Sequence, residues 1–136
     1  MTPLVRALAA ATVLATAFAA PAAAQDDADS LKVYFASGSA SIASDQSGTL
    51  DQAARLFREG SPFVMILSGG ADTVGAAERN LDLSLSRARA VADALVARGI
   101  PVARLQVLGR GNSELEVATD PGIANRENRV VEITWR

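Results

Sequence analysis

Residues 67–91 read LSGGADTVGAAERNLDLSLSRARAV, and this stretch decides how the chain folds. An apolar, strand-like run leads into it, and a glycine-rich turn follows that contains Asp72. A long alanine- and leucine-rich helix pattern then carries Asn80 and Arg87. A carboxylate and a guanidinium near one pocket can hold the ammonium and the carboxylate of a single zwitterionic ligand. The stretch therefore indicates binding more than bond-breaking chemistry.

Working outward, the pattern predicts an α/β (α+β) domain of two layers in the order β-α-β-α-β-β. Apolar residues at helical spacing predict helices over 47–60 and 76–98, the second ending at Gly99. Short apolar or β-rich runs predict strands over 31–35, 63–67, 104–109 and 129–135. We expect a mixed four-stranded sheet with the two main helices on one face. On the second helix, the stripe expected to face the core consists of Leu81, Leu85, Ala88, Ala92 and Leu95.

The composition excludes several classes of function. The chain has no histidine and no cysteine, so disulfides, thiolate ligands and the commonest general base and metal ligand are all absent. No catalytic residue, metal site or cofactor is predicted. After residue 24 the chain carries 12 basic and 15 acidic residues, a formal charge of −3. A mildly acidic surface argues against nucleic acid as a partner.

The N-terminus predicts export. One basic residue, Arg6, precedes an apolar run that ends in Pro21-Ala22-Ala23-Ala24. This is typical of a cleaved signal peptide over residues 1–24, since the apolar run is short for a membrane span. An acidic, flexible leader is expected over 25–30 and one domain over 31–136. We expect the mature protein in the periplasm, with no lipid-modified cysteine and no direct insertion into a membrane.

The order and spacing of these residues resemble the OmpA-like domain, a peptidoglycan-binding module of outer-membrane proteins, peptidoglycan-associated lipoproteins and flagellar stator proteins. The resemblance covers residues 33–133. The opening VYFASGSASI and the closing ENRVVEI are similar to the family's first and last motifs. The central signature matches at Gly69, Asp72, Gly75, Asn80, Leu83, Ser84, Arg87, Ala88 and Val91.

The resemblance implies a ligand and a site. In that family the aspartate and the helix arginine hold the ammonium and carboxylate of meso-diaminopimelate in the peptidoglycan stem peptide. These roles would fall on Asp72 and Arg87. Asn80 would add an amide contact, and Arg129 would border or support the same pocket. Outer-membrane or other envelope proteins are further candidate partners.

Each of these residues also has a purely structural interpretation. Asp72 can cap a turn, since aspartates commonly bond nearby backbone amides. Arg87 can be a solvated helix arginine, Asn80 can tie the loop to the helix start, and Arg129 can be structural. Distance alone does not bring Asp72 to Arg87, because Arg87 lies about 16 Å along a helix that starts at residue 76.

Three functions stay open. The favoured one is a non-catalytic peptidoglycan-binding domain that contributes to envelope integrity or anchoring. The alternative is a periplasmic protein–protein adaptor that keeps the fold with weak or lost peptidoglycan affinity. Gly70 and Ala71 support it, because they stand where the family has His and Thr. An enzyme such as a wall hydrolase is the third, and no acid–base pair is evident for it.

Overall fold

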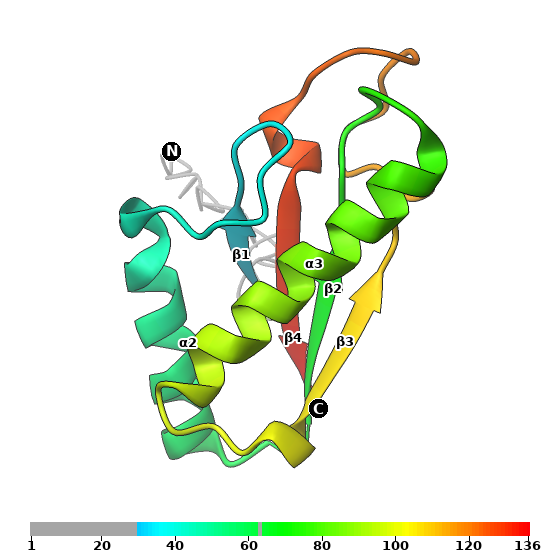
Figure 1. The fold of residues 1–136 in the computed structure, drawn as a ribbon. Helices are drawn as coiled ribbons and strands as arrows, with labels where there is room; N and C mark the ends of the chain where they lie inside the picture. Colours follow the sequence, from blue (N-terminus) through cyan, green and yellow to red (C-terminus); the bar gives the residue numbers. More distant parts are fainter. Residues whose placement is uncertain (1–29, 63) are drawn as a thin grey trace, which may run out of the picture.

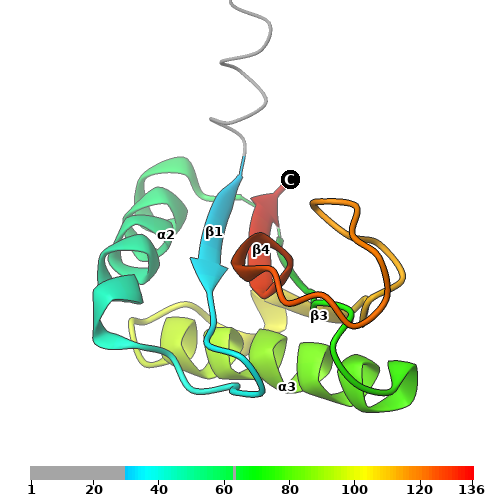
Figure 2. The same ribbon diagram turned by 90° about the horizontal axis from the view of Figure 1, so that it is seen from above.

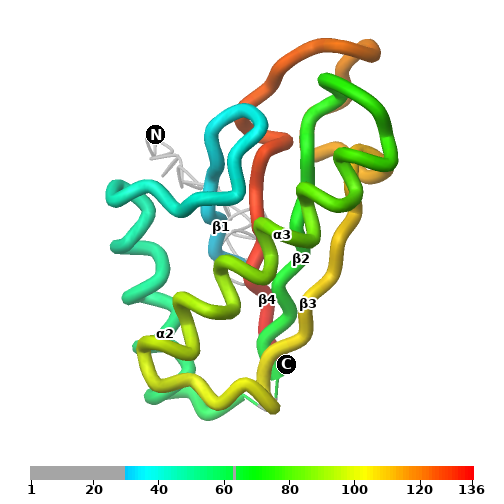
Figure 3. The backbone as a smooth tube through the Cα atoms, in the orientation of Figure 1, coloured from blue at the N-terminus to red at the C-terminus, as the bar shows by residue number. Residues whose placement is uncertain are grey.

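Four strands form one mixed sheet in the order β1-β4-β2-β3 (Figure 1). The computed structural model describes residues 30–62 and 64–136. The strands are β1 (Leu31–Tyr34), β2 (Met65–Gly69), β3 (Leu105–Gly109) and β4 (Val130–Trp135). β4 runs antiparallel to both neighbours, and β2 is parallel to β3. β1, β2 and β3 therefore end at the same edge of the sheet, and the loops that follow them gather there (Figures 1 and 3).

Two helices, α2 (Ser47–Gly60) and α3 (Ala77–Val96), cover one face of the sheet. Figure 2, seen along the strands, shows both helices on one side and the connection between β3 and β4 on the other. Three short 3₁₀ turns complete the described elements: η1 (Ser44–Gln46), η2 (Val102–Arg104) and η3 (Arg126–Asn128). The predicted fold class is confirmed, with element ends shifted by at most two residues.

The core lies between the helices and the sheet. Leu50, Ala53 and Ala54 face it from α2, as the helical spacing predicts. Alternate residues of β2 are buried, and in β4 the buried Val131 and Ile133 alternate with the half-buried Glu132 and Thr134, which is the pattern of a sheet with one covered face. The predicted stripe on α3 is correct at Ala88, Ala92 and Leu95 but wrong at Leu81, which is 48% exposed. The residues that α3 buries are Asn80, Ser84, Arg87, Ala88, Val91, Ala92 and Leu95.

Two glycines allow β2, the following turn and α3 to pack as they do. A Cβ on Gly69 would overlap the backbone carbonyl of Ser84, so only glycine lets strand and helix approach this closely. Gly75 has φ +88°, a left-handed conformation that side chains disfavour. The sequence requirement for glycine around Asp72 thus has two separate physical causes.

The N-terminal predictions fall outside the described residues. The signal peptide (1–24) and residues 25–29 of the acidic leader are not described, and neither is Phe63. Within the described ranges, no helix combines the length and hydropathy needed to cross a membrane.

Candidate functional site

The four predicted site residues meet at the edge where β1, β2 and β3 end. Asp72 lies three residues beyond β2, Asn80 and Arg87 lie on α3, and Arg129 directly precedes β4. In open sheets this edge is the usual place for ligands, because loops from neighbouring strands converge there. The fold therefore brings together residues up to 57 positions apart.

Asp72 is held by Arg129. The Arg129 Nη1 donates to Asp72 Oδ2 over 3.0 Å, and the two side chains are 14% and 7% exposed. Asp72 also accepts from the backbone N–H groups of Val74 and Asn125, each at 3.3 Å. Arg129 Nε donates to the carbonyl of Phe35 at 2.9 Å. The carboxylate is thus fixed in place, and Arg129 supports the residue that faces the pocket.

Arg87 is buried, with only 1% of its surface exposed. It donates to three backbone carbonyls: Nε to Ser39 at 2.8 Å, Nη1 to Gly70 at 3.0 Å and Nη2 to Ala36 at 3.1 Å. The interpretation of Arg87 as a solvated helix arginine is therefore wrong. One guanidinium ties α3 to the loop after β1 and to the end of β2, so it positions both.

The electrostatic setting of Arg87 follows from this burial. The pKa of Arg87 is lowered to about 10, because desolvation by burial outweighs the nearby charge of Asp72, which raises the pKa, and the charge of Arg129 adds to the lowering. Arg87 is charged at neutral pH because 10 is still well above 7. No hydrogen bond joins Arg87 to Asp72 among the described residues. The charges of Arg87 and Asp72 therefore act on each other through space, and the charge of Arg129 acts on Arg87 in the same way.

Asn80 ties the turn to the helix. Its side chain is 3% exposed, and its Nδ2 donates to the carbonyl of Val74 at 3.0 Å. Asn80 thus ties the loop to the helix start, while its Oδ1 makes no hydrogen bond among the described residues. Asn80 and Asp72 share one pocket, so a contact with a ligand is compatible with this bond.

The pocket has a volume of about 170 Å³. Its lining residues are Ser37, Gly38, Asp72, Val74, Gly75, Arg79, Asn80 and Leu83. Of the predicted residues only Asp72 and Asn80 line it, and Arg87 lies behind the loop that forms one wall. A carboxylate, an amide and a cation at this size of pocket suit a small zwitterion.

Sequence reasoning missed Arg79, Ser37 and Gly38. Arg79 is an exposed cation of the pocket, one position before Asn80. Its position next to Asn80 in the sequence was a signal that could have identified it. The direction in which a helix residue points, however, depends on the residue at which the helix starts. Gly38 has no side chain and Ser37 has only a small hydroxyl, so neither gave a signal in the sequence; the bonds from Arg87 to Ala36 and Ser39 hold them here.

Gly70 and Ala71 are buried under the site. A Cβ on Gly70 would lie 3.0 Å from the carbonyl oxygen of Asn128 and 3.4 Å from Arg110 Nη2. The space next to the position of the family's histidine is therefore filled in part by Arg110. Nε and Nη2 of Arg110 are buried without a hydrogen-bond partner, although Nη2 lies 3.5 Å from Glu116 Oε1.

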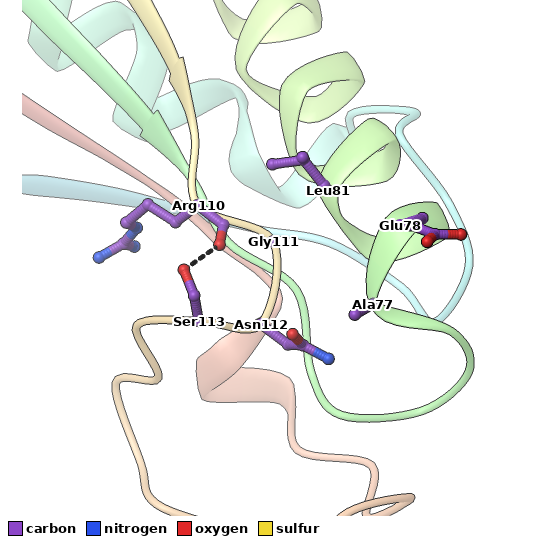
Figure 4. A pocket seen from close by; sticks show the side chains of 7 residues that line it. All are labelled: Ala77, Glu78, Leu81, Arg110, Gly111, Asn112 and Ser113. Carbon is purple, nitrogen blue, oxygen red and sulfur yellow. Dashed lines mark hydrogen bonds between the residues drawn. The ribbon is translucent and has the colours of Figure 1, made fainter.

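A second hollow of about 260 Å³ lies between the start of α3 and the loop after β3. Figure 4 shows that Leu81 and Ala77 face it while the guanidinium of Arg110 points away. None of the predicted site residues lines it. In the ranges 30–62 and 64–136, no cluster of acidic residues could hold a metal ion.

The OmpA family profile matches residues 34–129. The chain belongs to the OmpA family. A peptidoglycan-associated lipoprotein of Rhizobium meliloti (strain 1021) is 31% identical over 103 residues, which are 75% of this chain and 58% of that protein. The probable lipoprotein YiaD of Escherichia coli (strain K12) is 30% identical over 102 residues, 75% of this chain and 47% of that protein. The chain thus spans about half of each relative, and neither carries the name of an enzyme.

Solved structures share the fold. The peptidoglycan-associated lipoprotein from Burkholderia pseudomallei superposes with a TM-score of 0.72 at 24% identity, covering 78% of this chain and 90% of that one. The OmpA-like domain of FopA1 from Francisella tularensis gives a TM-score of 0.70 at 18% identity, covering 79% and 73%. At these identities the likeness establishes the OmpA-like fold.

Proposed function

We propose that this chain is a non-catalytic peptidoglycan-binding domain of the periplasm that holds the wall through diaminopimelate. The observation that carries the proposal is the buried Asp72 carboxylate, held ready by Arg129 at 3.0 Å and open to a pocket of about 170 Å³. The membership of the OmpA family and relatives named peptidoglycan-associated lipoprotein support it.

In the proposed complex, Asp72 accepts from the ammonium of the diaminopimelate centre, and Asn80 Oδ1 accepts beside it. Three of the five N–H donors of Arg87 are used by carbonyls, so two are available to the ligand carboxylate. Because Arg87 is 1% exposed, the proposed contact requires the exposed residues Ser37 and Gly38 to move aside. Charge-assisted bonds in a desolvated pocket then provide the affinity.

The test is co-sedimentation with purified sacculi that contain diaminopimelate, using Asp72→Asn. This change keeps the shape but removes the charge that faces the ammonium. Truncating one member of a desolvated charge pair costs roughly 2–5 kcal/mol, so binding should weaken by at least about 30-fold. Asp82→Asn, at an exposed acid on α3, is the matched control and should bind like the parent.

Two further arms sharpen this test. Arg79→Ala shows whether the ligand carboxylate uses the exposed arginine, with Arg89→Ala as control; we expect less than about a fivefold loss, since Arg79 is solvated. Sacculi with lysine in place of diaminopimelate should bind weakly, because they lack the second amino-acid centre. Parent-like sedimentation of Asp72→Asn would overturn the proposed grip.

The alternative is a periplasmic adaptor with the same fold, and one observation favours it. Gly70 and Ala71 bring no polar side chain to the site, and Arg110 lies beside Gly70. If the parent protein itself fails to sediment with sacculi while folding normally, the adaptor becomes the better proposal.

A further inference from the structure

A separate hollow of about 210 Å³ lies between the start of α2 and η3. It is lined by Tyr34, Phe35, Ala36, Ala43, Asp45, Gln46, Arg126 and Arg129. We name it the Arg126 pocket. Neither Asp72 nor Asn80 nor Arg87 lines it, and Arg129 is its one link to the proposed wall site.

Two guanidinium groups line the Arg126 pocket with donors to spare. Arg126 stacks over the Tyr34 ring, 4.4 Å from its centroid, and forms no salt bridge within the described ranges. The stacking holds the cation over a ring and limits its side-chain freedom. Arg129 uses Nε and Nη1 for Phe35 and Asp72, while its Nη2 makes no bond among the described residues.

The side-chain amide of Gln46 adds a neutral donor. The residue is 8% exposed, and its Oε1 accepts from the backbone N–H of Tyr34 at 2.9 Å. Because that partner is a donor, the amide orientation is determined, and Nε2 is the atom left over. No hydrogen bond among the described residues uses this Nε2. This Nε2 is therefore available to an acceptor in the pocket.

Backbone N–H groups at the start of η1 add further donors to the Arg126 pocket. η1 runs without a break into the 14-residue helix α2, and α2 has no side-chain cap at its N-terminus. The N–H groups of Ser44 and Asp45 have no acceptor within the described part of the chain. Unpaired N–H groups at a helix start carry partial positive charge. Asp45 is the one carboxylate that lines the pocket, and it opposes the two arginines only in part.

We propose that the Arg126 pocket binds an anionic oxygen group, a carboxylate or a phosphate, between Arg126 and Arg129. The forked donors of the two arginines and the Gln46 amide are the chemistry that such oxygens need. The inference does not depend on wall binding. If the proposed function holds, a further carboxylate of the wall peptide supplies the group, and otherwise a free anion does.

The primary experiment follows the ¹⁵N-labelled protein by NMR while sodium phosphate, and separately sodium acetate, replaces chloride at constant ionic strength. We expect saturable shifts of the Arg126 and Arg129 Nε–H signals and of the Ser44 and Asp45 amides. Arg126→Ala should weaken this binding about fivefold or more, since it removes one of two charged donors. Asp45→Asn should tighten it, since it removes the opposing charge.

Arg55→Ala is the matched control, because Arg55 is exposed on α2 and its loss changes the net charge equally. Binding unaffected by Arg126→Ala, shifts that do not saturate, or equal losses in Arg55→Ala and Arg126→Ala would overturn the proposal. Melting curves check that each variant is folded. We expect Arg126→Ala to fold normally, because Arg126 is exposed.

A second arm identifies the source of the anion. Arg126→Ala should lower the affinity for a soluble disaccharide tripeptide from the wall while leaving that for free diaminopimelate unchanged. Phosphate binding without any effect on the wall fragment assigns the pocket to a free anion. Loss of wall binding by Asp72→Asn with phosphate binding intact separates the two proposals, because the second pocket then works alone.

Discussion

Two parts of α3, here called its N-terminal half (residues 77–87) and its C-terminal half (residues 88–96), bury one helix face against one sheet with opposite chemistry. In the C-terminal half the buried residues are apolar, with Val91 and Leu95 fully inaccessible. In the N-terminal half they are polar, with Asn80 at 3%, Ser84 at 0% and Arg87 at 1% exposure. Burying polar groups costs free energy unless each finds a partner. The difference shows where α3 only fills space and where it holds the loops of the site.

The polar half meets that requirement bond by bond. Arg87 reaches three carbonyls, and Ser84 Oγ donates to Leu81 at 2.7 Å and accepts from the Gly111 N–H at 2.8 Å. Directional bonds fix loops that apolar packing cannot orient. The loops after β1, β2 and β3 are thereby positioned around Asp72 by one end of one helix.

The largest effect should come from Arg87→Met, which keeps a long side chain but strands three carbonyls. Hydrogen bonds to a charged group contribute about 1.5–3 kcal/mol each, partly offset here by the removed desolvation. We expect a loss of about 4 kcal/mol in the free energy of unfolding, measured by urea denaturation. Amide exchange of residues 36–39 should rise, and sacculus binding should fall.

The control for this change is Arg89→Met on the exposed side of the same helix, where stability should stay within about 0.5 kcal/mol. If Arg87→Met unfolds at the parent's urea midpoint, the polar half of α3 does not hold the loops.

A somewhat smaller effect is expected from Leu95→Ala in the apolar half. Truncating a fully buried leucine leaves a cavity and costs about 3 kcal/mol. Below the unfolding transition, however, binding to sacculi should equal that of the parent, because Leu95 supports no loop of the site. Val96→Ala, at a residue that is 43% exposed, should change neither quantity. A loss of wall affinity in folded Leu95→Ala would show that the two halves are not independent.

The same contrast explains what could be predicted from the sequence. Apolar periodicity locates β2, α3 and the apolar half, since Ala88, Ala92 and Leu95 are where hydrophobic spacing puts them. It fails at Leu81, because a method that looks for apolar residues cannot recognise a buried face made of Asn80 and Ser84. That polar face lies one residue earlier along the helix.

For the candidate site, the sequence predicted the residues but not all of the contacts between them. Motif spacing identified Asp72, Asn80, Arg87 and Arg129 through the resemblance, and the fold places them at one edge. The pairing of Asp72 with Arg129 joins residues 57 positions apart, so no local pattern contains it. The same is true of the Arg126 pocket, which is made by β1, the start of α2 and η3 together.

The open face of the sheet offers a third kind of polar contact, half exposed. Glu116 and Glu132 lie together there with Lys32 and Arg110. Desolvation and then the charge of Glu116 raise the pKa of Glu132. Desolvation also acts to raise the pKa of Glu116, but Lys32, the bond to Glu132 and Arg110 outweigh it and leave that pKa lowered.

Glu132→Gln should have the smallest effect and the opposite sign. Because the pKa of Glu132 is raised in the folded state, its contribution is present at low pH and is lost as pH rises above the ordinary value of about 4.3. Glutamine removes that loss, so the variant should be more stable than the parent at pH 7 by less than about 1 kcal/mol, and no more stable at pH 4. Melting temperatures at both pH values measure this. A variant destabilised at pH 7 would mean that Lys32 and Arg110 depend on Glu132, and that polar contacts on the open face hold structure as those of Arg87 do.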